Sequence, residues 1–252
     1  MKRFVLILCT MFFCVAAIAK TINIDWKVGN NIYSQSTCEY GGDLTVPATP
    51  PTKYGYTFQG WASFTPIEYL ESTGTQWIDT EYYPNNKTGI KIKIQFLSLK
   101  NGESVIFGGA TSWHNSAFEA FYWDNQLHFT YNNYTVNLEQ LRSGDIVEID
   151  WNQNIVKYSI NNGALQECNL GQKNFLSANK LHLLHMNRNT SEMGIARLFY
   201  VKVYDDDTLI RDFIPVLDKD GTPCMFDKVD GKFYYNKGTG NFIAGPGSFN
   251  NE

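Results

Sequence analysis

The feature that most constrains this chain is a series of short segments in which apolar and polar residues alternate. The clearest covers residues 90–96, where Ile90, Ile92, Ile94 and Phe96 are separated by Lys91, Lys93 and Gln95. A two-residue period places apolar side chains on one face of a strand and polar side chains on the other. A helix needs a period near 3.6 residues, and no window longer than about ten residues shows a convincing one. We therefore expect an all-β fold.

Turn residues separate these segments at short intervals. Strand pairs are expected at 118–123 with 127–131 around Asp124-Asn125-Gln126, at 146–151 with 155–160 around Asn152-Gln153-Asn154, and at 194–204 with 208–216 around Asp205-Asp206-Asp207. Asn162-Gly163 is a type I′ turn signal. Many short antiparallel strands between residues 66 and 246 predict a two-sheet sandwich or jelly roll.

Charge and composition exclude some classes of protein. The formal net charge is −4, with 25 acidic against 21 basic residues, whereas nucleic-acid binders carry a basic patch and a positive balance. Aromatic residues make up 15% of the chain, so it can build a core and is not disordered. We expect a globular protein that does not bind nucleic acid.

The N-terminus has the order of a secretory signal peptide. Lys2-Arg3 precedes an apolar stretch from Phe4 to Ile18, and Ala17-Ile18-Ala19 supplies the small residues of a cleavage site. This stretch is short for a membrane-spanning helix, which needs about 20 residues, although an uncleaved anchor is the alternative. We expect residues 1–19 to be removed and the mature chain to be secreted, extracellular or at the cell surface, without membrane insertion.

Three cysteines remain after cleavage: Cys38, Cys168 and Cys224. At most one disulfide forms within the chain. A Cys168–Cys224 pair is favoured because Cys38 lies in a separate segment, and three unpaired thiols are the alternative.

Residues 20–64 form a first module. Residues 21–26 alternate as a half-buried strand does, and the module ends on Pro47-Ala48-Thr49-Pro50-Pro51-Thr52-Lys53 followed by Tyr54-Gly55-Tyr56-Thr57-Phe58-Gln59-Gly60-Trp61. This end resembles the internalin B-repeat family, also called the Listeria-Bacteroides repeat. The resemblance implies a small β-grasp-like module of the kind found on secreted and surface-bound bacterial proteins. We interpret Tyr56, Phe58 and Trp61 as its core and not as a ligand platform.

A second resemblance covers most of residues 66–246. The stretch 67–80, IEYLESTGTQWIDT, and the closing stretch 211–236 are similar to the ends of domains in the concanavalin A-like, laminin-G-like superfamily. The resemblance implies a two-sheet jelly roll followed by a tail at 247–252. It also implies binding of glycans or protein partners, although the superfamily includes some glycoside hydrolases.

Glu148 and Asp150 are the strongest catalytic candidates. Strand periodicity places both on one face. Laminarinase-like hydrolases on this fold carry a further Glu at the end of such a strand, and retaining hydrolysis needs two carboxyl groups. Here Asn152 and Gln153 stand at those positions, and an amide cannot act as the acid. We therefore expect no enzyme, with a β-glucan hydrolase as the alternative.

Metal and cofactor signals are weak. His182 and His185 are three apart in an expected strand, which should point them to opposite faces and excludes a zinc pair. Asp205-Asp206-Asp207 could hold calcium, but a hairpin turn explains the same residues. We expect no metal and no cofactor, with calcium at this hairpin as the alternative.

Candidate ligand-binding residues lie in two loops: Trp113, His114 and Asn115 after Gly108-Gly109, and Tyr122, Trp123, Asp124 and Asn125 at a hairpin tip. Glycan sites pair a flat ring with amide, carboxylate or imidazole groups, because sugars present apolar C–H faces and hydroxyl rims. The alternative is that both tryptophans cover the ends of the core.

These observations predict a secreted or surface-associated, non-catalytic protein that recognises carbohydrate or a host or surface protein. The alternatives are a glycoside hydrolase on the same fold and a purely structural spacer module.

Overall fold

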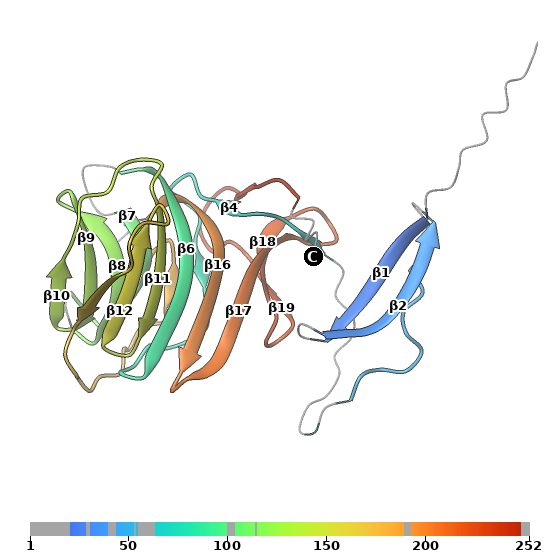
Figure 1. Cartoon of the computed structure of the whole chain (residues 1–252), viewed down its shortest axis with the longest axis horizontal. Helices are drawn as coiled ribbons and strands as arrows, with labels where there is room; N and C mark the ends of the chain where they lie inside the picture. Colours follow the sequence, from blue (N-terminus) through green and yellow to red (C-terminus); the bar gives the residue numbers. More distant parts are fainter. Residues whose placement is uncertain are drawn as a thin grey trace, which may run out of the picture. The chain divides into compact units, whose positions relative to one another are not determined.

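The computed structural model describes residues 21–28, 31–39, 44–52, 54, 64–99, 104–113, 115–188 and 193–247. The chain divides into two compact units with the boundary between residues 61 and 62 (Figure 1). The expected signal peptide and the aromatic residues at 56, 58 and 61 lie outside the described residues. No helix in the described part of the chain is long and apolar enough to cross a membrane.

The described part of the first unit contains an antiparallel hairpin of β1 (Thr21–Val28) and β2 (Asn31–Glu39). The strand expected at 21–26 is confirmed. Trp26 is buried, and its indole N–H donates a hydrogen bond of 2.9 Å to the hydroxyl of Ser36 across the hairpin. A complete β-grasp-like module remains a prediction, because residues 53 and 55–61 of its expected closing segment lie outside the described residues.

The second unit is an antiparallel jelly-roll sandwich, as expected (Figure 1). Sheet I has the order β10 (Tyr134–Asn137), β9 (Gln126–Asn132), β8 (Ala117–Trp123), β7 (Ser104–Gly109), β14 (His182–Leu183) and β5 (Ile78–Asp79), with β15 (Met186–Asn187) parallel to β7. Sheet II has the order β13 (Gln166–Asn169), β12 (Ile155–Ile160), β11 (Ile146–Asn152), β6 (Thr88–Ser98), β16 (Ile195–Asp205), β17 (Thr208–Leu217), β18 (Pro223–Asp227) and β19 (Lys232–Tyr234). The short strands β3 (Thr65–Pro66), β4 (Leu70–Glu71) and β20 (Ile243–Ala244) join sheet II.

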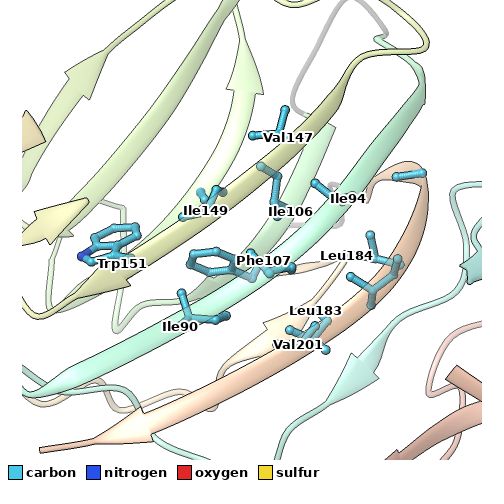
Figure 2. Packing of buried hydrophobic residues seen from close by; sticks show 14 of the residues in the cluster. Ile90, Ile94, Ile106, Phe107, Val147, Ile149, Trp151, Leu183, Leu184 and Val201 are labelled. Atoms are coloured by element: carbon cyan, nitrogen blue, oxygen red, sulfur yellow. The ribbon is translucent and has the colours of Figure 1, made fainter. Parts of the chain in front are cut away.

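Apolar side chains from the inner faces of both sheets form the core. Trp151 of β11 is 1% exposed, and its ring lies 4.3 Å from that of Phe118 and 5.9 Å from that of Phe107, both in sheet I. Figure 2 shows Trp151, Phe107 and Ile90 in this layer. The alternation at 90–96 is confirmed, because its four apolar side chains are fully buried. Each such side chain contributes about 1.5–3 kcal/mol by leaving water.

The expected hairpins form, and their turns use left-handed backbone. Asp124 and Asn125 connect β8 to β9 with φ angles of 46° and 62°, which short polar residues tolerate. The turn expected at Asn162-Gly163 is shifted by one residue. Asn161 and Asn162 have the positive φ angles, of 52° and 55°, and the Gly163 N–H closes the turn on the carbonyl of Ile160.

Phe64 belongs to the jelly-roll unit and not to the first module, where it was expected. Its ring lies 4.5 Å from that of Phe226 in β18. Residues 65 and 66 pair as β3 with β17. At the other end, the N–H of Glu68 donates to the carbonyl of Pro246. Both ends of the unit are therefore held beside sheet II.

The Cys168–Cys224 disulfide expected from the sequence is wrong, and both residues are free thiols. Cys168 lies in β13 and Cys224 in β18, with five strands between them in sheet II. Neighbouring strands are about 4.8 Å apart, whereas a disulfide needs Cα atoms within about 7 Å. Burial raises the pKa of Cys168 to about 11 and that of Cys224 to about 12, so both thiols are poor nucleophiles.

Candidate functional site

Strand β8 separates its side chains between the two faces of sheet I. Phe118 and Tyr122 point into the core, whereas Glu119, Phe121 and Trp123 point to the outer face. Tyr122 is 4% exposed, and its hydroxyl donates to the carbonyl of Leu141. Tyr122 therefore is a core residue, and its assignment as a ligand-binding residue is corrected.

Five side chains form a continuous row across the outer face of sheet I, which we call the aromatic row: Trp113, Arg188, Phe121, His128 and Trp123. The guanidinium carbon of Arg188 lies 3.8 Å from the ring centre of Trp113 and 5.6 Å from that of Phe121. The Phe121 and His128 rings stack at 5.1 Å with an interplanar angle of 4°. The His128 and Trp123 ring centres are 5.8 Å apart. The structure thus brings the two predicted tryptophans onto one face.

An ion pair without solvent exposure lies beneath this row. The Nη1 atom of Arg188 is 3.2 Å from Oε2 of Glu119, and both side chains are 0% exposed. The carboxylate neutralises the guanidinium and fixes its plane, and Trp113 covers it with a cation–π contact. The row therefore presents rings to solvent without a net charge from this pair.

The ends of the row are open to solvent. Trp113 is 54% exposed and Trp123 is 45% exposed. Asn115 is exposed and holds the Trp113 loop in a tight turn, in which backbone hydrogen bonds join it to Ser112. Asp124 and Asn125 are exposed beside Trp123. His114 lies outside the described residues.

Sequence reasoning missed four of the residues that build this face: Glu119, Phe121, His128 and Arg188. Strand alternation places Glu119 and Phe121 on the face of Trp123, so that signal was available. The partner of Glu119 is 69 residues away in the chain, and alternation within a strand gives no information about such a contact.

Glu148 and Asp150 lie on the outer face of sheet II, so their expected placement on one strand face is confirmed. The Nζ atom of Lys93 is 2.7 Å from Glu148, and that of Lys91 is 2.8 Å from Asp150. Asn152, where a hydrolase would need an acid, donates its amide N–H to Asp207. These contacts describe a charged sheet face. The absence of catalysis remains a prediction.

The prediction that His182 and His185 point to opposite faces is wrong. Their Nδ1 atoms are 3.0 Å apart, and both rings stack on Trp77 at centroid distances of 4.2 and 4.9 Å. Strand β14 ends at Leu183, and Leu184 has a φ angle of 63°, which breaks the alternation. Burial lowers the pKa of His182 to about 4. No group of three potential metal-binding side chains occurs in the described part of the chain.

The hairpin at Asp205-Asp206-Asp207 is confirmed, with Asp206 and Asp207 at positive φ. Each of the three carboxylates contacts a side chain elsewhere in the protein. Asp205 accepts from Asn85 at 3.2 Å, Asp206 pairs with Lys87 at 2.8 Å, and Asp207 accepts from Asn152 at 3.1 Å. Calcium at this hairpin would have to replace or share these contacts, and it remains an alternative to be tested.

No family model matches the sequence, and no curated protein matches it. Solved structures similar to this chain are jelly-roll sandwiches. They include the CBM40 domain of the Ruminococcus gnavus IT-sialidase bound to α2,3-sialyllactose, at 12% identity over 54% of this chain and 89% of that chain, with a TM-score of 0.39. A heptameric SAP-like pentraxin from Limulus polyphemus is 10% identical over 58% of this chain and 76% of that chain, with a TM-score of 0.38. Domains LG4-5 of the mouse laminin α1 chain are 10% identical over 66% of this chain and 50% of that chain, with a TM-score of 0.40.

Proposed function

We propose that this chain is a secreted or surface-associated, non-catalytic binding protein whose jelly-roll unit recognises carbohydrate through the aromatic row. The observation that carries the proposal is the pair of half-exposed tryptophans, Trp113 and Trp123, on one face of sheet I. Buried contacts through Arg188, Phe121 and His128 connect them.

The chemistry of the row suits a sugar. Exposed indole rings can pack against the C–H face of a pyranose, and the side chains of Asn115, Asp124 and Asn125 at the two ends can bond its hydroxyl rim. A rigid platform also loses little conformational entropy on binding. Because Glu119 cancels the charge of Arg188, the row favours neutral glycan faces over strongly anionic ones.

Two further parts of the proposal rest on sequence and charge. Secretion rests on the Lys2-Arg3 leader and the Ala17-Ile18-Ala19 cleavage pattern. A non-catalytic role is supported by the lysines that pair with Glu148 and Asp150 and by the amide of Asn152. A protein partner on the same face is the alternative binding mode.

A glycan array with purified residues 20–252 tests the proposal, run with calcium and with chelator. The Trp113→Ala, Trp123→Ala double variant should lose binding while its circular dichroism spectrum shows that it is still folded. Tyr83→Ala is the matched control, because Tyr83 is 47% exposed and lies outside the row.

Equal binding by the double variant would reject the row as the site. Silence of the wild type across the array would reject recognition of the displayed glycans and favour a protein partner. Loss of binding with chelator would support calcium at residues 205–207.

A further inference from the structure

A groove of about 440 Å³ opens on the outer face of sheet II, on the sheet opposite to the one that carries the aromatic row. It lies where β6 and β12 begin and where β11 and β16 end. Its volume falls within the range of small-molecule sites, roughly 300–1,000 Å³. The residues that line it are Gly89, Lys91, Asp150, Trp151, Asn152, Ile155, Lys157, Tyr204 and Asp207.

The groove exists because residue 89 has no side chain. Gly89 pairs with Asn152 on one side and with Tyr204 on the other, and cross-strand partners point to the same face. A Cβ atom at Gly89 would lie 3.2 Å from the carbonyl oxygen of Trp151 and 3.4 Å from Cβ of Tyr204. Any larger side chain would therefore fill the floor between Asn152 and Tyr204.

The charges that line the groove are balanced and already partnered. Lys91 pairs with Asp150 at 2.8 Å, and Asp207 accepts from Asn152 at 3.1 Å. Lys157 pairs with Glu167 at 3.6 Å. Two lysines and two aspartates line the groove, so it has no net formal charge. An anionic ligand would have to break the ion pair of Lys91 or Lys157, and a cationic ligand would meet only one carboxylate, Asp207, that is not already paired with a lysine.

We propose that this groove is a second binding site, for a neutral, hydroxyl-rich ligand of the size of one or two sugar rings. Hydroxyl groups both donate and accept hydrogen bonds, so they can bond Asp150 and Asp207 as well as Lys91 and Lys157 while the ion pairs stay in place. Tyr204 and Ile155 provide an aromatic and an aliphatic wall for the apolar face of such a ring. This site does not depend on the aromatic row.

Amide chemical-shift mapping on the ¹⁵N-labelled mature chain tests the proposal. The probes are lactose, maltose and cellobiose as neutral disaccharides, with glucuronate and glucosamine as charged comparisons. We expect at least one neutral disaccharide at millimolar concentration to shift the amides of Gly89, Asn152 and Asp207. The charged sugars should bind at least tenfold more weakly.

Gly89→Val fills the groove and should abolish these shifts, and Tyr204→Ala, which removes the aromatic wall, should weaken binding at least tenfold. If Gly89→Val fails to fold, Tyr204→Ala still tests the site. Ser159→Val is the matched control, because it adds a β-branched side chain on β12 outside the groove.

The Trp113→Ala, Trp123→Ala variant should keep the groove shifts, so failure of the aromatic row and failure of the groove are distinguishable. The proposal is overturned if no neutral disaccharide shifts the groove amides, or if the shifts persist in folded Gly89→Val. Equal or tighter binding of a charged sugar would overturn the ligand class.

Discussion

At the residue scale, Arg188 determines how Trp113 is presented. Its guanidinium lies between the Trp113 ring, 3.8 Å away, and Glu119, 3.2 Å away, and no part of its side chain is exposed. A cation without solvent contact needs both its counter-charge and its hydrogen bonds to offset desolvation. The ion pair beneath the row should therefore matter much more than the exposed Lys–Asp pairs on sheet II, which contribute little.

Removing one member of this pair is expected to destabilise the protein strongly. Glu119→Met or Arg188→Met alone leaves one buried charge without its partner, at a cost of about 3–5 kcal/mol. The Glu119→Met, Arg188→Met double variant should lose less stability than either single variant, because neither charge of this pair remains. Urea unfolding of the four proteins measures this. Additive losses in the double variant would show that Glu119 and Arg188 do not act as a pair.

At the scale of elements, alternation predicts long strands well and short ones poorly. Strand β6 forms where period-2 patterning predicts it, and β8 and β9 form on the two sides of the polar turn at residues 124–126, as that turn predicts. Strand β14 has two residues, too few to show a period. The left-handed Leu184 then reverses the side-chain order and places His185 beside His182.

The aromatic row was predictable only in part, because local signals reveal its two tryptophans but not the residues that connect them. Trp113 follows Gly108-Gly109 and Trp123 precedes the turn at Asp124-Asn125, and a sequence shows both signals directly. Arg188 approaches Glu119 from a distant segment, and the sequence contains no sign of that pairing. Likewise, the groove at Gly89 depends on which strands flank β6, and only the sheet order reveals its neighbours β11 and β16.

The histidine pair makes stability depend on pH. Neutral His182 accepts a hydrogen bond from Asn187 at Nε2 and contacts His185 through Nδ1. Burial lowers its pKa from 6.5 to about 4, so the unfolded chain binds a proton more readily than the folded chain. The resulting stabilisation is fully present above pH 6.5. It is lost as the pH falls towards 4, by at most about 3 kcal/mol.

His182→Phe keeps a ring beside Trp77 but cannot bind a proton. Its free energy of unfolding should fall less steeply between pH 6.5 and pH 4 than that of the wild type. Urea unfolding at several pH values measures both slopes, and the comparison does not require equal stability at neutral pH. Parallel slopes would mean that His182 does not titrate as its burial requires.

At the scale of the whole molecule, one large core stabilises the jelly-roll unit, and the described cysteines form no disulfide. Sheet II places Cys168 and Cys224 on strands separated by five others, so packing must hold the sandwich closed. Trp151 shows how: one side chain of sheet II contacts Phe107, Phe118 and Phe129 of sheet I. The positions of Cys168 and Cys224 in the sequence could not predict that both stay unpaired, because the sequence does not show the order of the strands in sheet II.

The mature chain should therefore unfold at the same temperature with and without a reducing agent. Removing a native disulfide typically costs 2–5 kcal/mol, and each kcal/mol shifts the melting temperature of a chain this size by about 2–4 °C. A disulfide between Cys168 and Cys224 would thus produce a shift of several degrees. We expect a shift below about 1 °C and three reactive thiols after denaturation without reductant. A Cys168–Cys224 disulfide found by peptide mapping, together with a reductant-sensitive melting temperature, would contradict the strand order of sheet II, because that order keeps β13 and β18 five strands apart.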